Sequence, residues 1–263
     1  MVIKGSTMPN TALVTGASSG IGREFARLHA SKGGDLIITA RRSAELDALK
    51  FELESAHKVS VTTVALDLGA DGGADALFEA VKDHPIDILI NNAGFGGHGV
   101  FTDRTLASDL AMIDLNVKAL VTLCHHVGNK MASNGGGKIL NVSSTAAYMP
   151  GPLQATYFAT KAYVSSFSQA MDEELRDKGV SVTVLEPGYV HTEFAEVAAL
   201  EGTGLTRQKG ATPAQVALCG YEAMQAGKLR VINEAKLSFL LNWVFPFLPR
   251  RTVLKSIRRM QEK

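Results

Sequence analysis

The chain has 263 residues, of which 46% are hydrophobic and 20% are charged, and this is enough for one large hydrophobic core without disulfides. Its formal net charge is +1 and the charges are scattered through most of the chain, which excludes the strongly basic surface of a nucleic-acid-binding protein. The N-terminus has Lys4 but no apolar leader, and no stretch approaches the roughly 18 apolar residues of a spanning helix. We therefore expect a cytoplasmic protein with a small-molecule partner.

Short apolar runs alternate with longer helical patterns, as in consecutive βαβ units. Strands are predicted at Ala12–Thr15, Leu36–Ala40, Ser60–Ala65, Ile86–Asn91, Lys138–Ser143, Ser181–Glu186 and Arg230–Ile232. Helices are predicted at Gly20–Ser31, Ser43–Ala56, Asp71–Val81, Leu106–Ala132, Ala155–Lys178 and Pro213–Ala226. Most strand runs are unbroken Val, Ile and Leu, which is typical of parallel strands buried on both faces. Because parallel neighbours need right-handed crossovers, the sequence predicts a single α/β domain with a doubly wound parallel sheet of about seven strands flanked by helices.

The two cysteines, Cys124 and Cys219, lie in apolar, helix-like surroundings. They lack the close Cys and His spacing that zinc sites need. We expect two reduced core residues and no metal site.

The segment from Thr11 to Leu28, TALVTGASSGIGREFARL, joins the first strand to the first helix through a glycine-rich turn. Glycine is needed where a chain takes unusual dihedrals, where a ligand approaches the backbone and where a helix packs closely on a strand. The N-terminus of the helix that follows can bind a phosphate. The segment therefore indicates a Rossmann-type dinucleotide site, although glycine spacing alone would also fit an ordinary βα turn.

Further motifs follow this turn in order. They are Asn91-Asn92-Ala93-Gly94, Asn116, Ser144, Tyr157-Phe158-Ala159-Thr160-Lys161 and Pro187-Gly188. Together with TGxxxGxG at Thr15 to Gly22, their spacing over residues 11–195 resembles that of the short-chain dehydrogenase/reductase family, in particular its carbonyl, ketoacyl and hydroxysteroid reductases. The resemblance implies an NAD(P)-dependent oxidoreductase that acts on CH–OH or C=O groups.

We divide the chain on this basis into a flexible N-terminus at 1–10, a catalytic domain at 11–235 and an apolar and basic extension at 236–263. Residues 188–210 have no clear period, and a loop of this length in a compact domain is usually functional. We expect a substrate loop near 188–212.

Tyr157 and Lys161 are four residues apart on a predicted helix, so their side chains share one face. A phenol has a pKa of about 10, and a nearby ammonium favours its ionised form. Standing alone, the pair would also fit a solvated helix face. The resemblance implies that Tyr157 is the general acid and base, that Ser144 polarises the substrate carbonyl with Ser143 as a neighbouring hydroxyl, and that Asn116 holds a water beside Lys161.

The resemblance also implies a set of positions that hold the cofactor. Among them, the carboxylate of Asp67 would meet the adenine amino group, and the segment from Pro187 would contact the nicotinamide carboxamide. The full set is Gly16, Ser18, Ser19, Gly20, Ile21, Gly22, Arg41, Arg42, Asp67, Leu68, Asn91, Ala93, Gly94, Tyr157, Lys161, Pro187, Gly188, Val190 and Thr192.

The end of the second strand indicates which cofactor is preferred. Enzymes that use NAD usually place an acid there to bind the ribose 2′-hydroxyl, whereas a 2′-phosphate needs cations instead. Ala40 stands at the acid's place and Arg41 and Arg42 follow, so NADP(H) is favoured over NAD(H). Against this, no basic residue stands among Ala17 to Ser19, where NADP-using relatives often carry one.

The substrate pocket is expected between Phe95 to Phe101, Ala146 to Leu153 and the loop after Gly188. These windows are largely apolar, which suggests a lipophilic ketone or aldehyde; His98 could orient a substrate oxygen or face solvent. The apolar and aromatic members are Phe95, Val100, Tyr148, Met149, Leu153, Tyr189 and Phe194.

The segment Leu237 to Leu248 reads LSFLLNWVFPFL and precedes a cluster of Arg and Lys. Apolar residues beside cations fit a helix in a membrane interface, although Pro246 and Pro249 interrupt it. A dimer contact or a flap over the substrate mouth fits as well. The resemblance implies a homodimer or homotetramer formed by the helices at Leu106–Ala132 and Ala155–Lys178.

We therefore expect an NADPH-dependent reductase of a lipophilic carbonyl compound. An NAD-dependent alcohol dehydrogenase of the same family and a non-catalytic dinucleotide-sensing protein on the same fold are the alternatives. The intact Ser, Tyr, Lys and Asn set weighs against the second alternative.

Overall fold

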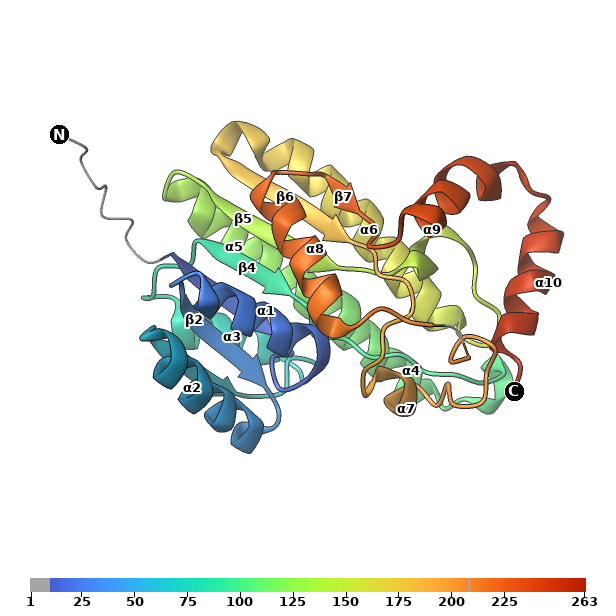
Figure 1. The fold of residues 1–263 in the computed structure, drawn as a ribbon, viewed down its shortest axis with the longest axis horizontal. Coiled ribbons are helices and arrows are strands. Elements are labelled where there is room, and N and C mark those ends of the chain that lie inside the picture. Colours follow the sequence, from blue (N-terminus) through green and yellow to red (C-terminus); the bar gives the residue numbers. More distant parts are fainter. Residues whose placement is uncertain (1–9, 208) are drawn as a thin grey trace.

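A parallel sheet of seven strands forms the centre of the computed structural model, which describes residues 10–207 and 209–263 (Figure 1). The strand order β3-β2-β1-β4-β5-β6-β7 reverses next to β1, which makes the sheet doubly wound and confirms the predicted fold class. The strands are β1 (Thr11–Thr15), β2 (Asp35–Ala40), β3 (Val61–Ala65), β4 (Ile88–Asn91), β5 (Gly137–Val142), β6 (Val180–Leu185) and β7 (Arg230–Val231). Of the predicted flexible N-terminus, residues 1–9 lie outside the described residues.

Helices cover both faces of the sheet. One face packs against α1 (Gly20–Ser31), α2 (Ser43–His57) and α8 (Pro213–Gln225), and the other against α3 (Gly73–Val81), α5 (Leu120–Ser133) and α6 (Ala155–Leu175). The remaining helical segments are η1 (Phe101–Asp103), α4 (Leu106–Ile113), η2 (Asp114–Ala119), η3 (Thr145–Tyr148), η4 (Arg176–Lys178), α7 (Phe194–Val197), α9 (Ala235–Phe239), η5 (Leu240–Val244), η6 (Phe245–Phe247) and α10 (Arg250–Gln261).

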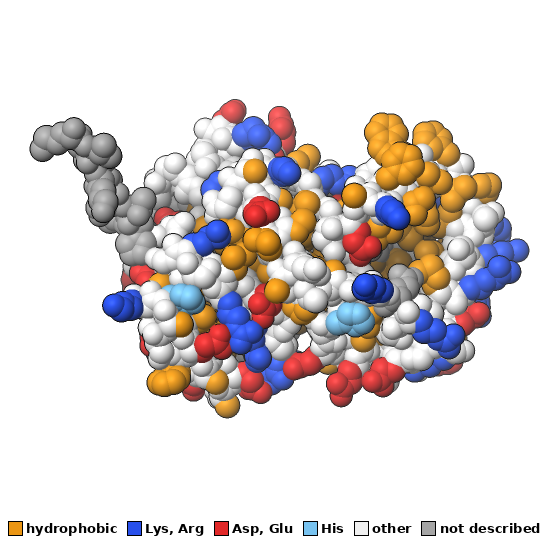
Figure 2. All heavy atoms as spheres, viewed as in Figure 1, with side chains coloured by type: hydrophobic (Ala, Val, Ile, Leu, Met, Phe, Trp, Pro, Cys, Tyr) orange, Lys and Arg blue, Asp and Glu red, His pale blue; other side chains and the backbone are white. Residues whose placement is uncertain are grey.

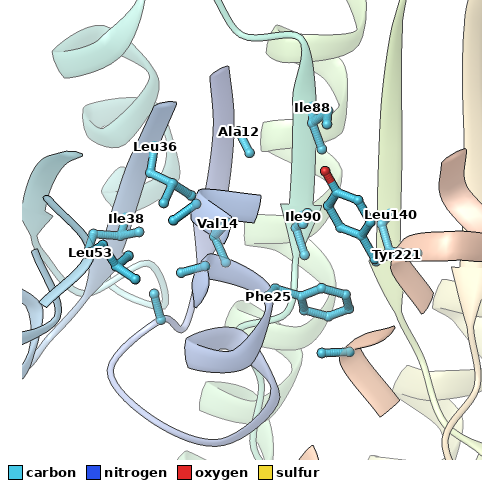
Figure 3. Packing of buried hydrophobic residues seen from close by; sticks show 14 of the residues in the cluster. Ala12, Val14, Phe25, Leu36, Ile38, Leu53, Ile88, Ile90, Leu140 and Tyr221 are labelled. Carbon is cyan, nitrogen blue, oxygen red and sulfur yellow. The ribbon is translucent and has the colours of Figure 1, made fainter. Parts of the chain in front are cut away.

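The central strands are buried on both faces because successive side chains point to opposite sides of a sheet. In β1, Val14 packs with α1, α2 and α8, whereas its neighbour Leu13 packs with the helices of the other face. Figure 3 shows the first of these clusters, with Phe25 of α1 and Tyr221 of α8 lying against the strands. This two-sided core holds the strand ends in fixed positions.

The helix predicted at Leu106–Ala132 is divided by a π-helical turn. The segment α4 ends at Ile113, and η2 follows before α5 begins at Leu120. A π turn accommodates one more residue than an α turn, so it redirects the side chains around it, and such turns are frequent at functional sites. Asn116 lies in this turn.

The chain after Pro187 has little regular structure until α8. An isolated bridge joins Val190 to Ala211, and α7 is a single turn. The extension at 236–263 lies beyond the sheet, at the opposite end of the molecule from α2 (Figure 1). None of the helices within residues 10–207 and 209–263 has the length and apolar content to cross a bilayer.

Candidate active site

A cavity of about 680 Å³ opens at the carboxyl ends of the central strands. The residues that directly follow β1, β2, β3, β4 and β5 line it, and so does Pro187, two residues after β6, as expected where the strand order of a doubly wound sheet reverses. Residues of the C-terminal extension line it as well. Of the predicted site residues, all except Gly22, Asn91 and Asn116 line this one cavity.

The glycine turn has a shape that only glycine can adopt. Gly16 and Gly20 have positive φ angles of 68° and 55°, and a Cβ on Gly22 would lie 2.3 Å from the Gly16 carbonyl oxygen. Ser19 begins α1 with no side-chain hydrogen bond to the helix end, so the first backbone N–H groups of α1 remain available. A bare backbone at a helix N-terminus fits the pyrophosphate of a dinucleotide. Gly22 therefore shapes the turn from beneath the cavity.

The two asparagines at the end of β4 point in different directions. Asn91 is buried and donates to Asn141 Oδ1 at 2.9 Å and to Cys124 Sγ at 3.3 Å, away from the cavity. Asn92 lines the cavity, and its Nδ2 donates to the carbonyl oxygen of Thr15 at 3.0 Å. The hydroxyl of Thr15 in turn accepts from the backbone N–H of Asn92 at 3.0 Å. The side chain that closes the glycine turn is thus that of Asn92, which was not among the predicted site residues.

Cations lie at the end of the cavity next to β2. Arg42 donates to Ser18 Oγ from Nη2 at 3.2 Å, and Arg41 lies beside it in the lining. Arg42 also pairs with Glu193 at 3.1 Å, which joins the glycine turn to the loop after Pro187. Asp67, another lining residue, accepts from the backbone N–H of Gly69 at 2.9 Å.

Tyr157 and Lys161 lie on α6 and both line the cavity, although little of either side chain is exposed. Lys161 Nζ donates to the carbonyl oxygen of Val142 at 2.9 Å and lies 5.8 Å from the centre of the Tyr157 ring. The predicted sharing of one helix face is therefore seen in the structure.

Burial shifts the pKa of both groups. It raises the pKa of Tyr157 to about 12, and a hydrogen bond with Ser144 opposes this rise. It lowers the pKa of Lys161 to about 8. Both shifts have the same cause, because removal from water disfavours whichever form carries the charge. The sequence led us to expect that Lys161 would make the phenol more acidic, but in the protein alone burial has the larger effect.

The remaining predicted catalytic side chains lie next to this pair. Ser144 lines the cavity and its hydroxyl accepts from the N–H of Ala146 at 3.1 Å. Ser143 instead donates to the carbonyl oxygen of Lys161 at 2.7 Å and so supports the backbone. Asn116 binds Phe95 twice, accepting from its N–H at 3.0 Å and donating to its carbonyl oxygen at 2.9 Å. The amide of Asn116 thus holds the start of the Phe95 loop at the edge of the cavity.

A buried carboxylate joins three segments behind the site. Glu186 is fully buried and accepts from Ser165 of α6, from Tyr148 of η3 at 2.8 Å, and from Arg230 of β7 at 3.0 Å. Tyr148 was expected in the substrate pocket, but its hydroxyl is used here and it does not line the cavity. The backbone of Pro187 continues from this anchored point into the site.

The substrate end of the cavity is mainly apolar. Of the residues predicted there, Phe95, Met149, Tyr189 and Phe194 line it, whereas Val100 and Leu153 do not. His98 bonds to the backbone oxygen of Gln261 at 2.7 Å. The other lining residues at this end, which were not among the individually predicted pocket residues, are Gln154, Phe158, Val197, Leu200, Leu205, Leu237, Leu240, Leu241, Phe245, Ile257, Met260 and Gln261.

Seven of these twelve residues belong to the C-terminal extension, which therefore covers the cavity as a flap, one of the roles that the sequence analysis allowed for it. A sequence pattern in α10 could have indicated this packing, because the buried residues Val253, Ile257 and Gln261 follow one another at a spacing of four. That spacing marks one face of a helix.

Comparisons with known proteins agree with this geometry. The sequence model of the short chain dehydrogenase family matches residues 10–201. Very-long-chain 3-oxoacyl-CoA reductase of Coprinopsis cinerea is 33% identical over 71% of this chain, and the match spans 56% of that reductase. Serine 3-dehydrogenase of Agrobacterium fabrum is 35% identical over 72% of this chain and 76% of that enzyme.

Solved structures extend the likeness to nearly the whole chain. A short-chain dehydrogenase from Sphingobium yanoikuyae in complex with NADPH is 30% identical, covers 97% of this chain and 99% of its own, and superposes with a TM-score of 0.84. The fold and its cavity define an oxidoreductase that binds a nicotinamide dinucleotide at the ends of a doubly wound sheet. The chain belongs to the short-chain dehydrogenase family.

Proposed function

We propose that the chain is an NADPH-dependent reductase of a lipophilic ketone or aldehyde, with Tyr157 as the proton donor to the substrate oxygen. The main support is that Tyr157, Lys161 and Ser144 share one cavity with an apolar end large enough for an organic substrate. The relative named a 3-oxoacyl-CoA reductase adds support for reduction of a ketone.

The state of the buried phenol suits reduction. With its pKa raised, the Tyr157 hydroxyl stays protonated at neutral pH and can donate to a substrate oxygen, to which the Ser144 hydroxyl also offers a hydrogen bond. The Lys161 ammonium lies near the ring and stabilises the phenolate that remains after proton transfer. A bound nicotinamide dinucleotide supplies the hydride.

The preference for NADPH rests on the end of β2. Ala40 offers no carboxylate to a ribose hydroxyl, and Arg41 and Arg42 both line the cavity at this point. Guanidinium groups bind phosphate through paired hydrogen bonds. The NADPH complex of the Sphingobium yanoikuyae relative supports the same preference.

An NAD-dependent alcohol dehydrogenase is the second candidate, and Glu193 favours it. The carboxylate of Glu193 pairs with Arg42 and brings negative charge to the place where a 2′-phosphate would bind. A carboxylate there repels phosphate and accepts well from a hydroxyl. The two candidates therefore differ in what Arg42 contacts when the cofactor is bound.

We also propose that the enzyme is a homodimer or homotetramer. Apolar side chains are exposed on α4, where Leu106 is 73% and Leu110 48% exposed, and Tyr163 on α6 is 43% exposed. These helices belong to the two segments predicted to form subunit contacts. A cytoplasmic location remains the prediction from the sequence.

Two measurements test the proposal. A panel of ketones and aldehydes of graded chain length, followed by NADPH absorbance, is expected to show rates that rise with apolar length. Fluorescence titration of NADPH and NADH against the wild type and Arg41→Ala is expected to show a loss of NADPH affinity only. Equal NADPH affinity in both proteins would contradict the cofactor assignment, and absence of turnover with every carbonyl compound would contradict the reaction.

A further inference from the structure

The C-terminal extension exposes an unusual set of large apolar side chains, which we name the apolar tip. It consists of Phe239 (61% exposed), Leu240 (43%), Trp243 (69%), Phe247 (81%) and Leu248 (39%). Figure 2 shows hydrophobic side chains gathered over α9 and the segment that follows it. A cluster of exposed aromatic residues within ten positions marks a contact surface.

Cations surround the apolar tip. Residues 235–263 contain seven Lys and Arg residues and one acidic residue, Glu262, although the whole chain has a net charge of only +1. Glu262 pairs with Arg258 at 3.1 Å. Lys236 precedes the tip, and Arg250 and Arg251 follow it directly, all of them exposed. The extension is thus strongly positive while the rest of the chain is negative.

The extension has the structure of a segment that lies at a membrane surface rather than one that crosses the bilayer. The apolar tip lies between the short helices α9 and α10, in a stretch interrupted by Pro246 and Pro249. Trp and Phe flanked by Lys and Arg are typical of segments that lie at the boundary between lipid headgroups and acyl chains. The same stretch also reaches the cavity, since Leu237, Leu241 and Phe245 line it.

We propose that the apolar tip docks onto an anionic phospholipid surface, with its aromatic side chains in the headgroup region and Lys236, Arg250 and Arg251 against lipid phosphates. A second copy of the chain is the less suitable occupant, because a two-fold contact would bring two strongly positive extensions together. Docking sets the cavity mouth against the bilayer and goes beyond the proposed reductase function, on which it does not depend.

The tryptophan provides a direct test, because Trp243 is the only tryptophan in the chain. The full-length protein is titrated with vesicles of phosphatidylcholine alone and of phosphatidylcholine with phosphatidylglycerol, and Trp243 emission is followed. We expect a blue shift with the anionic vesicles, quenching by lipids brominated near the headgroup, and a partition coefficient that falls as salt is added. Unchanged emission at every lipid concentration would overturn the proposal.

Two double variants separate the apolar contribution to docking from the electrostatic contribution. Phe239→Glu with Phe247→Glu and, separately, Arg250→Glu with Arg251→Glu are each expected to weaken partitioning at least about tenfold. All four side chains are exposed and none lines the cavity, so thermal stability and turnover of a water-soluble ketone should stay unchanged. Phe51→Glu is the matched control, since Phe51 is 76% exposed on α2, far from the extension in sequence. If the control weakens partitioning equally, the tip is not the docking surface.

Sedimentation velocity without lipid tests whether a second copy of the chain binds the apolar tip instead. The sedimentation coefficient of Phe239→Glu with Phe247→Glu should match that of the wild type. A smaller assembly in this variant would assign the apolar tip to a second copy of the chain and overturn the membrane proposal.

Discussion

The two ends of the cavity are built in different ways. At the strand ends, backbone atoms approach so closely that a Cβ on Gly22 would lie 2.3 Å from a carbonyl oxygen and 2.5 Å from Asn92 Nδ2. At the other end, leucine, isoleucine and phenylalanine side chains from the loop after Pro187 and from the extension supply the lining. The family match ends at residue 201, so the whole extension lies outside it. Under the proposed function, cofactor binding and catalysis would therefore depend on tightly packed backbone contacts, whereas substrate choice would depend on apolar side chains that can be exchanged.

The largest effect is expected at the strand-end side, from Tyr157→Phe. Loss of the only proton donor proposed for the substrate oxygen should lower kcat by about 10²- to 10⁴-fold, while NADPH binding stays intact. Steady-state rates and fluorescence titration measure the two quantities. Tyr163→Phe, an exposed position on the same helix, serves as the control. Substantial turnover by Tyr157→Phe would remove that residue from the mechanism.

Gly22→Ala tests the close contacts directly. The added methyl group should force the glycine turn apart, at a cost of about 1–3 kcal/mol, and weaken cofactor binding about tenfold or more. Gly33→Ala is the control, because a Cβ there would meet nothing within 4 Å, although its φ of +80° adds some strain. Cofactor affinity like that of the wild type in Gly22→Ala would show that the turn has room after all.

The pH dependence of reduction should follow Lys161. Below pH 8 this side chain carries its proton, and as pH rises through its lowered pKa of about 8 the ammonium is lost. Tyr157 stays protonated over the same range, so kcat should fall up to about tenfold per pH unit above 8. A pH–rate profile of the wild type beside Lys161→Met, whose residual rate should lack this fall, measures the effect. A flat wild-type profile up to pH 10 would contradict the role of the ammonium.

A smaller and different effect is expected at the substrate end. Phe245→Ala removes apolar contact from the lining and should raise KM for long ketones about tenfold, with kcat changed less than about twofold. Phe247→Ala, which is exposed and does not line the cavity, should leave both constants as in the wild type. A fall in kcat in Phe245→Ala as large as that in Tyr157→Phe would contradict the assignment of catalysis to one end of the cavity and substrate binding to the other.

The smallest effect concerns the ion pair between Arg42 and Glu193, which joins the two ends. Glu193→Gln should release Arg42 and lower KM for NADPH by about two- to fivefold, because exposed ion pairs are weak. KM for NADH should not fall. Glu196→Gln, in α7 close by, is the matched control. The same change for both cofactors would show that Glu193 does not discriminate between them.

The sequence predicted most of the cavity end that lies at the strand ends, because the motifs that form it are short and local in the chain. The residues from Gly16 to Gly22 determine the shape of the βα turn by themselves. The four-residue spacing of Tyr157 and Lys161 places both side chains on one face of their helix. Several features depended instead on long-range packing. The pairing of Arg42 with Glu193 spans 151 residues, and the closure of the cavity by α10 follows from tertiary contacts.

Three finer points could not be derived from motifs either. Which of Asn91 and Asn92 faces the cavity depends on where β4 ends, and the direction of the Tyr157 pKa depends on burial. The π turn around Asn116 interrupts an apolar pattern that reads as one continuous helix. Each of these depends on where the chain lies in three dimensions rather than on its local residue types.

The carboxylate of Glu186 has a consequence for how the enzyme fails. It joins the η3 segment that follows Ser144, the helix that carries Tyr157 and strand β7, and its own backbone leads directly into Pro187. Because one anchor serves three parts of the catalytic apparatus, damage at that point cannot stay confined to one of them. We therefore expect heat or chemical modification that disrupts this anchor to disorder all three segments together.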